Sequence, residues 1–300
     1  MIINHRDNGD GRPVDQSGLQ IRAIHSRLFD TNSGLLSSEG QALLIDPGIF
    51  PDEIQGILAV ADQQRFMLQA VLLTHSHWDH ILGPESLPGI PVMAQAAFIQ
   101  TAAGQKEVIR REIAAWESEH HLVRPRLFNP PVPDLTFEKE IEFFLGKEHL
   151  RFLAAPGHTP DQCVVYHPAS ACLWAADMLS DREIPFVSHN LAAYRSSLAM
   201  IAALEIRSLV PGHGHPSSDP HEIQARLAGD RAYLDELHEK VSQAVSQGKS
   251  MQETAANCAS IPYRQGSENG GPHRLNVESA YLEAGGDPAG RAAAGWAQVG

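Results

Sequence analysis

Four potential metal ligands within six positions constrain this chain more than any other feature. The segment THSHWDH, residues 74–80, directly follows the apolar run AVLL and supplies the side chains of His75, His77, Asp79 and His80. A loop at the carboxyl end of a buried strand can turn such side chains toward one point, where α/β folds often place their sites. Simple solvation would explain an isolated His-x-His pair, but four ligands after a strand favour a metal site.

The spacing of these ligands favours two ions over one. In an extended segment His75, His77 and Asp79 lie on the same side, whereas the adjacent Asp79 and His80 diverge unless the chain bends. A single ion cannot easily take all four groups. We therefore expect His75 and His77 to hold one ion, and Asp79 and His80 to hold a second.

Three downstream residues stand in the same setting, each directly after an apolar strand. His158 lies in APGHTPDQ, Asp177 ends the run ACLWAAD, and His213 lies in VPGHGHP. Taken singly, each has a simpler explanation as a turn or cap residue. Together they add imidazoles for both ions and a carboxylate that can bridge them.

The composition limits the partners of the protein. The 300 residues contain 23 Lys and Arg against 36 Asp and Glu, a net charge of −13. Nucleic acid is therefore not an expected partner, because binding phosphates requires clustered basic residues.

No apolar run approaches the roughly 20 residues of a membrane helix, and the start of the chain has no apolar signal region. With three irregularly spaced cysteines, we expect a cytoplasmic protein, monomeric or homodimeric, that acts on a small molecule away from membranes.

Periodicity predicts strands alternating with amphipathic helices. We expect a loose N-terminus over 1–17, a main domain over 18–218, a C-terminal helical extension over 219–284 and a poorly ordered tail over 285–300. Asp219 is the predicted N-cap of the extension, with Pro220 at the first helical position and Glu222 completing a capping box. The expected strands span 19–29, 41–48, 70–74, 91–94, 139–145, 149–157, 163–168, 171–177 and 208–214, and the expected helices 51–68, 106–121, 194–205, 219–245, 250–258 and 272–284.

These motifs resemble those of the metallo-β-lactamase superfamily, in its glyoxalase II-like and lactonase-like branch. The resemblance covers roughly residues 20–216 and includes TNS at 31–33 and LIDPG at 44–48. It implies an α+β fold, a four-layer αβ/βα sandwich, here with a C-terminal helical extension. By motif match, metal 1 takes His75, His77 and His158, metal 2 takes Asp79, His80 and His213, and Asp177 bridges the two ions.

Departures from the family pattern narrow the expected activity. Ser180 stands where lactonases of this branch carry a tyrosine, which weakens an acyl-homoserine lactonase assignment. The family's true β-lactamases lack the bridging aspartate that Asp177 provides. His215 matches no family ligand, and we expect it to lie behind the site or on the surface.

The resemblance implies a metal-dependent hydrolase with two divalent ions, most simply zinc, with manganese or iron also suited to the ligands. A metal-bridging hydroxide would attack an ester, thioester or lactone carbonyl of a small molecule, with Asp79 and Asp177 as catalytic residues. One alternative is a mononuclear non-haem iron persulfide dioxygenase that uses His75, His158 and Asp177. A second alternative is a β-lactam or phosphodiester hydrolase.

Substrate contacts are expected from the segment after Asp177, together with the helix around Trp116 and the Pro-rich connection that follows it, because loops at strand ends usually carry specificity. Its candidates are Phe186, His189 and Tyr194. The competing explanation is that Phe186 and Tyr194 fill the core beneath the loop.

Overall fold

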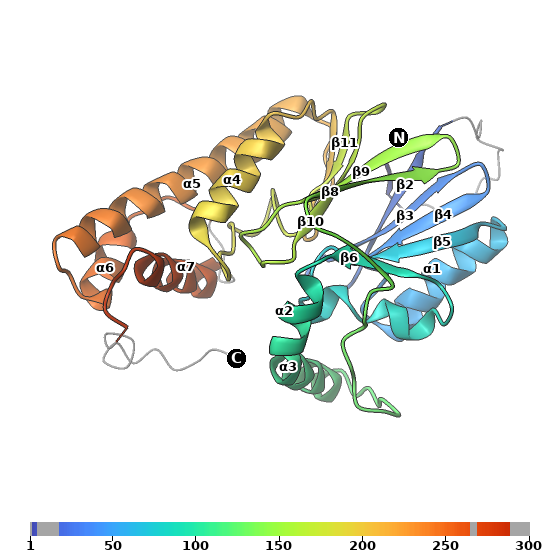
Figure 1. Cartoon of the computed structure of the whole chain (residues 1–300), viewed down its shortest axis with the longest axis horizontal. Coiled ribbons are helices and arrows are strands. Elements are labelled where there is room, and N and C mark those ends of the chain that lie inside the picture. The colour runs from blue at the N-terminus through green and yellow to red at the C-terminus, as the bar shows by residue number, and fades with distance from the viewer. Residues whose placement is uncertain (1, 5–17, 265–268, 289–300) are drawn as a thin grey trace.

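Two β-sheets lie face to face at the centre of the protein (Figure 1). The computed structural model describes residues 2–4, 18–264 and 269–288. The first sheet has its strands in chain order, with β2, β3 and β4 antiparallel and the other neighbouring pairs parallel. Its strands are β1 (Ile2–Asn4), β2 (Gln20–His25), β3 (Asn32–Ser38), β4 (Gln41–Ile45), β5 (Met67–Leu72), β6 (Val92–Gln95) and β7 (Leu135–Phe137).

The second sheet has the order β12-β11-β10-β9-β8, and its only parallel pair is β11 with β12 among the described strands. Side chains alternate along each strand, so every sheet has an inner and an outer face. In β4, Leu43 and Ile45 point inward toward Phe152 and Trp174 of the second sheet, whereas Leu44 points outward to the helices. The strands are β8 (Glu140–Leu145), β9 (Glu148–Ala154), β10 (Cys163–His167), β11 (Cys172–Trp174) and β12 (Ser208–Val210).

Helices cover the outer face of each sheet. The first sheet packs against α1 (Pro51–Gln63), α2 (Phe98–Gly104) and α3 (Lys106–Glu119). The outer face of the second sheet shares one apolar cluster with helices on the opposite side of the molecule (Figure 1). These helices are α4 (Leu191–Ala202), α5 (Pro220–Ser246), α6 (Met251–Cys258) and α7 (Gly270–Glu283). The expected four-layer αβ/βα sandwich with C-terminal helices is confirmed.

Some local expectations were wrong. Ile2–Asn4 were expected to be loose but form β1, because pairing with β2 satisfies backbone groups at a sheet edge. Helix α2 had not been predicted from its short apolar pattern. Residues 5–17 and 289–300 lie outside the described residues, so the expectations for them stay predictions. Among the helices described, none is long and apolar enough to cross a bilayer.

The start of α5 follows the prediction in part. The Asp219 carboxylate caps the helix by accepting a hydrogen bond from the backbone N–H of His221 at 2.8 Å. Glu222 does not complete the capping box, because its carboxylate pairs with the Ser217 hydroxyl and with Arg226.

Candidate metal centre

Seven side chains from four strand ends converge at one edge of the sandwich. The loop after β5 carries four of them, and the loops after β9, β11 and β12 carry one each. Within each of two groups, one ligand atom per residue lies within 4.8 Å of the others. The first group is His75, His77, His158 and Asp177, and the second is Asp79, His80 and His213. The structure thus brings all seven predicted ligands together in the grouping that the motifs implied.

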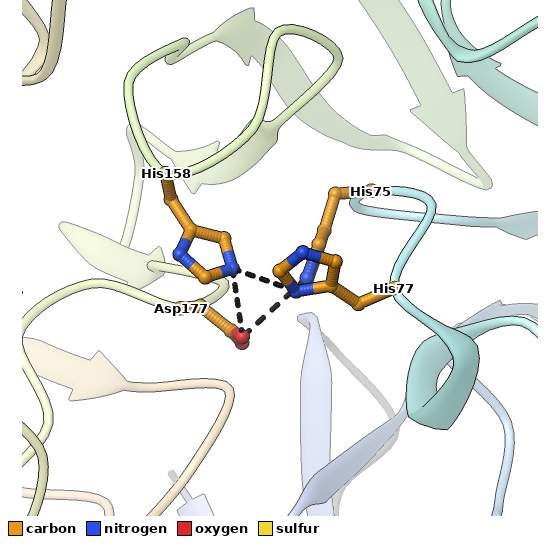
Figure 2. Close-up of side chains that lie close together, drawn as sticks. All are labelled: His75, His77, His158 and Asp177. Atoms are coloured by element: carbon orange, nitrogen blue, oxygen red, sulfur yellow. Dashed lines mark hydrogen bonds and ion pairs between the residues drawn. The ribbon is translucent and has the colours of Figure 1, made fainter. Parts of the chain in front are cut away.

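The first group surrounds a single point (Figure 2). His158 Nε2 lies 3.0 Å from His77 Nδ1 and 3.3 Å from Asp177 Oδ2, and His75 Nε2 lies 3.4 Å from the same oxygen. Ligand atoms arranged tetrahedrally around one zinc ion are about 3.3 Å apart, given metal–ligand distances near 2.0–2.1 Å. The spacing in this group therefore suits one ion of that size.

The second group lies directly beside Asp177 of the first group. His213 Nε2 lies 3.2 Å from His80 Nε2 and 3.4 Å from Asp79 Oδ2. The Asp177 carboxylate faces both groups, with Oδ1 3.3 Å from His80 Nε2 and Oδ2 3.3 Å from His213 Nε2. Asp177 is therefore close to both groups, as a carboxylate that bridges two ions would be.

A short 3₁₀ helix explains how neighbouring Asp79 and His80 can serve one group. In an extended chain their side chains would diverge. Trp78–His80 instead form a single turn, in which the His80 N–H donates to the His77 carbonyl at 3.1 Å. The bend that the sequence required is thus made by the loop itself.

Outer hydrogen bonds fix how the imidazoles are oriented. The Nδ1–H of His80 donates to Asp46 Oδ2 at 3.0 Å, and that of His158 donates to the Phe186 carbonyl at 2.8 Å. On the outer side of His213, Nδ1 lies 3.2 Å from the Phe29 carbonyl. With protons assigned to the outer nitrogens, the Nε2 lone pairs of these rings point inward. Sequence reasoning missed Asp46 as a positioning residue, although LIDPG contains it.

The inner atoms fit metal ions better than they fit one another. His75 Nε2 and Asp177 Oδ1 are buried and make no hydrogen bond. Facing lone pairs on imidazole nitrogens and carboxylate oxygens repel unless a cation lies between them. These residues therefore form two His/Asp metal-binding sites.

The charges of the site also favour a cation. Burial raises the pKa of the Asp177 carboxyl, but the nearby His213 and His80 outweigh it and hold this pKa well below its usual value. Likewise against the effect of burial, Asp177 and Glu183 raise the pKa of His213 to about 10. The carboxylates thus stabilise positive charge, which can be a proton or a metal ion that displaces it.

Gly212 allows the close approach of the strand end that carries Asp177. A Cβ at position 212 would lie 2.2 Å from Asp177 Oδ1. We expect Gly212→Ala to displace this carboxylate and to lower the affinity of the protein for metal at least about tenfold, because mutations that disturb the support of a metal ligand have effects of that size. Chelator competition measures it, with Gly229→Ala as control because no atom lies within 4 Å of that Cβ. Unchanged metal affinity in Gly212→Ala would contradict this role.

A cavity of about 210 Å³ opens beside the ligands. Of the expected substrate contacts, Phe186 and Tyr194 line it, whereas His189 is exposed and is not among its lining residues. Trp116 and the Pro-rich connection do not line it either. Tyr194 is fully buried and its hydroxyl donates to the Asp177 carbonyl at 3.1 Å, so it supports the site from beneath. His215 also lies outside both ligand groups, where Nδ1 pairs with Asp181 at 2.9 Å.

The C-terminal helices build part of this cavity. Asn276 of α7 accepts from the Val187 N–H at 2.7 Å and donates to the Pro185 carbonyl at 2.6 Å, on either side of Phe186. The Phe186 carbonyl in turn orients His158. Ser180, noted in the sequence as the position of the lactonase tyrosine, also lines the cavity. Cavity residues that sequence reasoning did not single out are Phe29, Leu179, Glu183, Ile184, Pro185, Asp230, Asn269 and Pro272. Only the position of the segment after Asp177 had pointed to some of them.

Curated proteins are similar in sequence to part of this chain. A Beta-lactamase-like protein 2 homolog from Drosophila melanogaster is 28% identical over 199 residues, 64% of this chain and 61% of the relative. A hydroxyacylglutathione hydrolase from Psychromonas ingrahamii is 26% identical over 147 residues, 48% of this chain and 46% of the relative. The matched region thus spans less than two thirds of the length of these relatives.

Solved structures with the same fold cover more of the chain. A beta-lactamase domain protein from Burkholderia ambifaria has a TM-score of 0.64 at 20% identity, over 91% of this chain and 90% of that chain. A sec-alkylsulfatase from Pseudomonas sp. has a TM-score of 0.63 at 17% identity, over 84% of this chain and 47% of that chain. The family profile described as the metallo-beta-lactamase superfamily matches residues 26–213, more than half of the sequence. With its paired sheets and two His/Asp sites, this chain belongs to the metallo-beta-lactamase superfamily.

Proposed function

We propose that this protein is a binuclear metallo-hydrolase that cleaves an ester, thioester or lactone bond in a small molecule. The observation that carries the proposal is the pair of ligand groups sharing the Asp177 carboxylate beside an open cavity. Relatives named hydroxyacylglutathione hydrolase support hydrolysis as the reaction class. We propose zinc as the ion for both groups, since their ligands are imidazoles and carboxylates in four-coordinate spacing.

When bound, two divalent ions supply an acidic water as nucleophile and a Lewis acid for the carbonyl oxygen. The side chains of the protein hold the ligand groups in place and orient the reacting water. Asp177 fixes the separation of the two ligand groups, and Asp79 lines the cavity, where its carboxylate can accept a hydrogen bond from the attacking water. The apolar side chains of Ile184 and Phe186 limit the water that reaches the reacting carbonyl.

Metal content and turnover together test this proposal. We expect close to two ions per chain by elemental analysis of anaerobically purified protein, and hydrolysis in a panel of esters, thioesters and lactones after loading with zinc. Active protein without metal, or a metal-loaded protein that cleaves none of the panel, would refute the hydrolase. A single iron with oxygen-dependent turnover of a persulfide would instead support the dioxygenase alternative, whose His75, His158 and Asp177 also lie together.

Phe186 and His189 provide a matched pair for the cavity. Phe186 lines the cavity with its ring centroid 5.7 Å from that of His158, whereas His189 is exposed outside it. We expect Phe186→Ala to lower kcat/KM about tenfold, because removing the ring takes away apolar contact with the substrate that contributes about a factor of ten to its affinity. His189→Ala should leave kcat/KM within about twofold. Equal values for both variants across the panel would dismiss Phe186 as a substrate contact.

A further inference from the structure

Two aromatic rings flank the metal ligands at the cavity. The Phe29 ring centroid lies 6.4 Å from that of His213, and the Phe186 centroid lies 5.7 Å from that of His158. Phe29 is 56% exposed, although it is a large apolar side chain beside a polar cluster. Leu179, Ile184, Pro185 and Pro272 continue this apolar wall. Such a wall suits the apolar part of a ligand.

Apart from the metal ligands, the charged side chains that line the cavity are acidic. Its other charged residues are Glu183 and Asp230, and no Lys or Arg is found among the described residues that line it. Asp230 is neutralised by Arg264 at 2.7 Å. Glu183 has no such partner, because none of the described cations comes within 4.0 Å of its carboxylate.

The main chain of Glu183 is held in place on both sides. Its N–H donates to the Ser180 hydroxyl at 3.1 Å, and its carbonyl accepts from Arg264 at 3.0 Å. Burial raises the pKa of the Glu183 carboxyl, and although His213 opposes the shift, Asp177 adds to it. Glu183 is thus partly shielded from water, which strengthens the effect of its charge on a ligand in the cavity.

The arginines that share a recess with Glu183 do not offset its charge. Arg27 and Arg182 line a recess that shares Glu183 with the cavity, so they are the candidates for binding an anionic group. Each is already paired with a carboxylate, Arg27 with Asp52 at 2.8 Å and Arg182 with Asp30. A second anion would meet a guanidinium whose positive charge a carboxylate already offsets.

We propose that the site takes an uncharged substrate with an apolar acyl group, and that Glu183 is the residue that disfavours anionic substrates. This inference rests on the proposed hydrolase function and names the substrate class of the same site. The acyl chain lies against Phe29, Ile184 and Phe186. A carboxylate at the end of that chain meets the negative charge of Glu183, which is paired with none of the described Lys or Arg side chains.

A pair of matched substrates tests the preference. Phenyl pentanoate and monophenyl glutarate differ only in a terminal methyl group replaced by a carboxylate. With the zinc-loaded full-length protein at low ionic strength, and after subtraction of the rates without enzyme, we expect kcat/KM to be at least about tenfold higher for the pentanoate. Equal or faster turnover of the glutarate would overturn the inference and leave the hydrolase standing.

The variant Glu183→Gln assigns the preference to one side chain. We expect it to reduce the pentanoate-to-glutarate ratio at least about threefold, because the repulsive charge is gone while the size of the side chain is kept. Glu239→Gln, at an exposed position of α5, makes the same change in net charge and should leave the ratio unaltered. A ratio that is the same in wild type and Glu183→Gln would remove Glu183 from this role.

A binding measurement separates this inference from the proposed function. Heptan-2-one and 6-oxoheptanoate form an analogous pair that cannot be hydrolysed, and NMR titration of the loaded protein gives their Kd values. We expect tighter binding of the neutral ketone, with the difference reduced in Glu183→Gln. If neither ester is cleaved but this pattern holds, the hydrolase fails and the substrate class stands. If 6-oxoheptanoate binds as tightly as the ketone, the substrate class fails.

Discussion

Replacing Asp177 with alanine should lower kcat/KM at least about a thousandfold while the chain stays folded. The carboxylate faces both ligand groups, so its loss removes the bridge that sets their separation. The strand before it is held independently, because β11 is buried and pairs with β10 and β12 through its backbone. Elemental analysis should find fewer than two ions per chain, and circular dichroism should find native secondary structure.

Asp181→Ala is the matched control for this variant. Asp181 lies four residues further along and pairs with His215 outside the ligand groups, so both ions should be retained. If Asp177→Ala were insoluble, the carboxylate would be a structural cap of the loop. If it kept two ions and full activity, the bridging role would be wrong.

Ending the chain after Pro216 should leave an insoluble protein, or one whose melting temperature falls by more than about 15 °C. Helices α5, α6 and α7 share one apolar cluster with the outer face of the second sheet, and Ile223, Leu234 and Leu237 are fully buried in it. Each such side chain contributes about 1.5–3 kcal/mol, against a total of about 5–15 kcal/mol for a typical domain. Thermal denaturation and light scattering measure the outcome. A truncated chain that stays soluble, metal-loaded and equally active would show the helices to be an independent appendage.

Asn276→Ala tests the same connection without removing the helices. The substitution removes the two side-chain hydrogen bonds of Asn276, to the residues on either side of Phe186. The Phe186 carbonyl orients His158. We expect metal affinity to fall about tenfold, the usual effect of losing support behind a ligand, with a smaller loss of stability. Asn257→Ala, at an exposed position of α6, should change neither quantity.

The ligands could be predicted because each is tied to a local pattern. His75, His158, Asp177 and His213 all follow apolar strands, and strands of one sandwich present their ends at a common edge. The 3₁₀ turn that unites Asp79 and His80 is a property of the loop, but only the structure shows that the chain bends there. Sequence spacing therefore indicated two ligand groups, and the fold supplied their distances.

The cavity could not be predicted in the same way. Phe29, Glu183 and Asn269 come from loops that lie far apart in sequence, and no periodicity marks them as neighbours. His189 shows the converse, since it lies in the right segment but faces solvent.

The sequence by itself determined the alternation of strands and helices, the seven candidate ligands and the capped start of α5, because these depend on apolar runs, local caps and spacing along the chain. The four-layer sandwich followed from the resemblance of its motifs to those of the family. Only the tertiary structure decided that α7 supports the loop behind His158, that Asp46 orients His80, and that Glu183 stands unpaired by any described cation beside the ligands. The physical reason is that these contacts arise from long-range packing, which joins side chains according to the faces that the sheets and helices bury rather than their order in the chain.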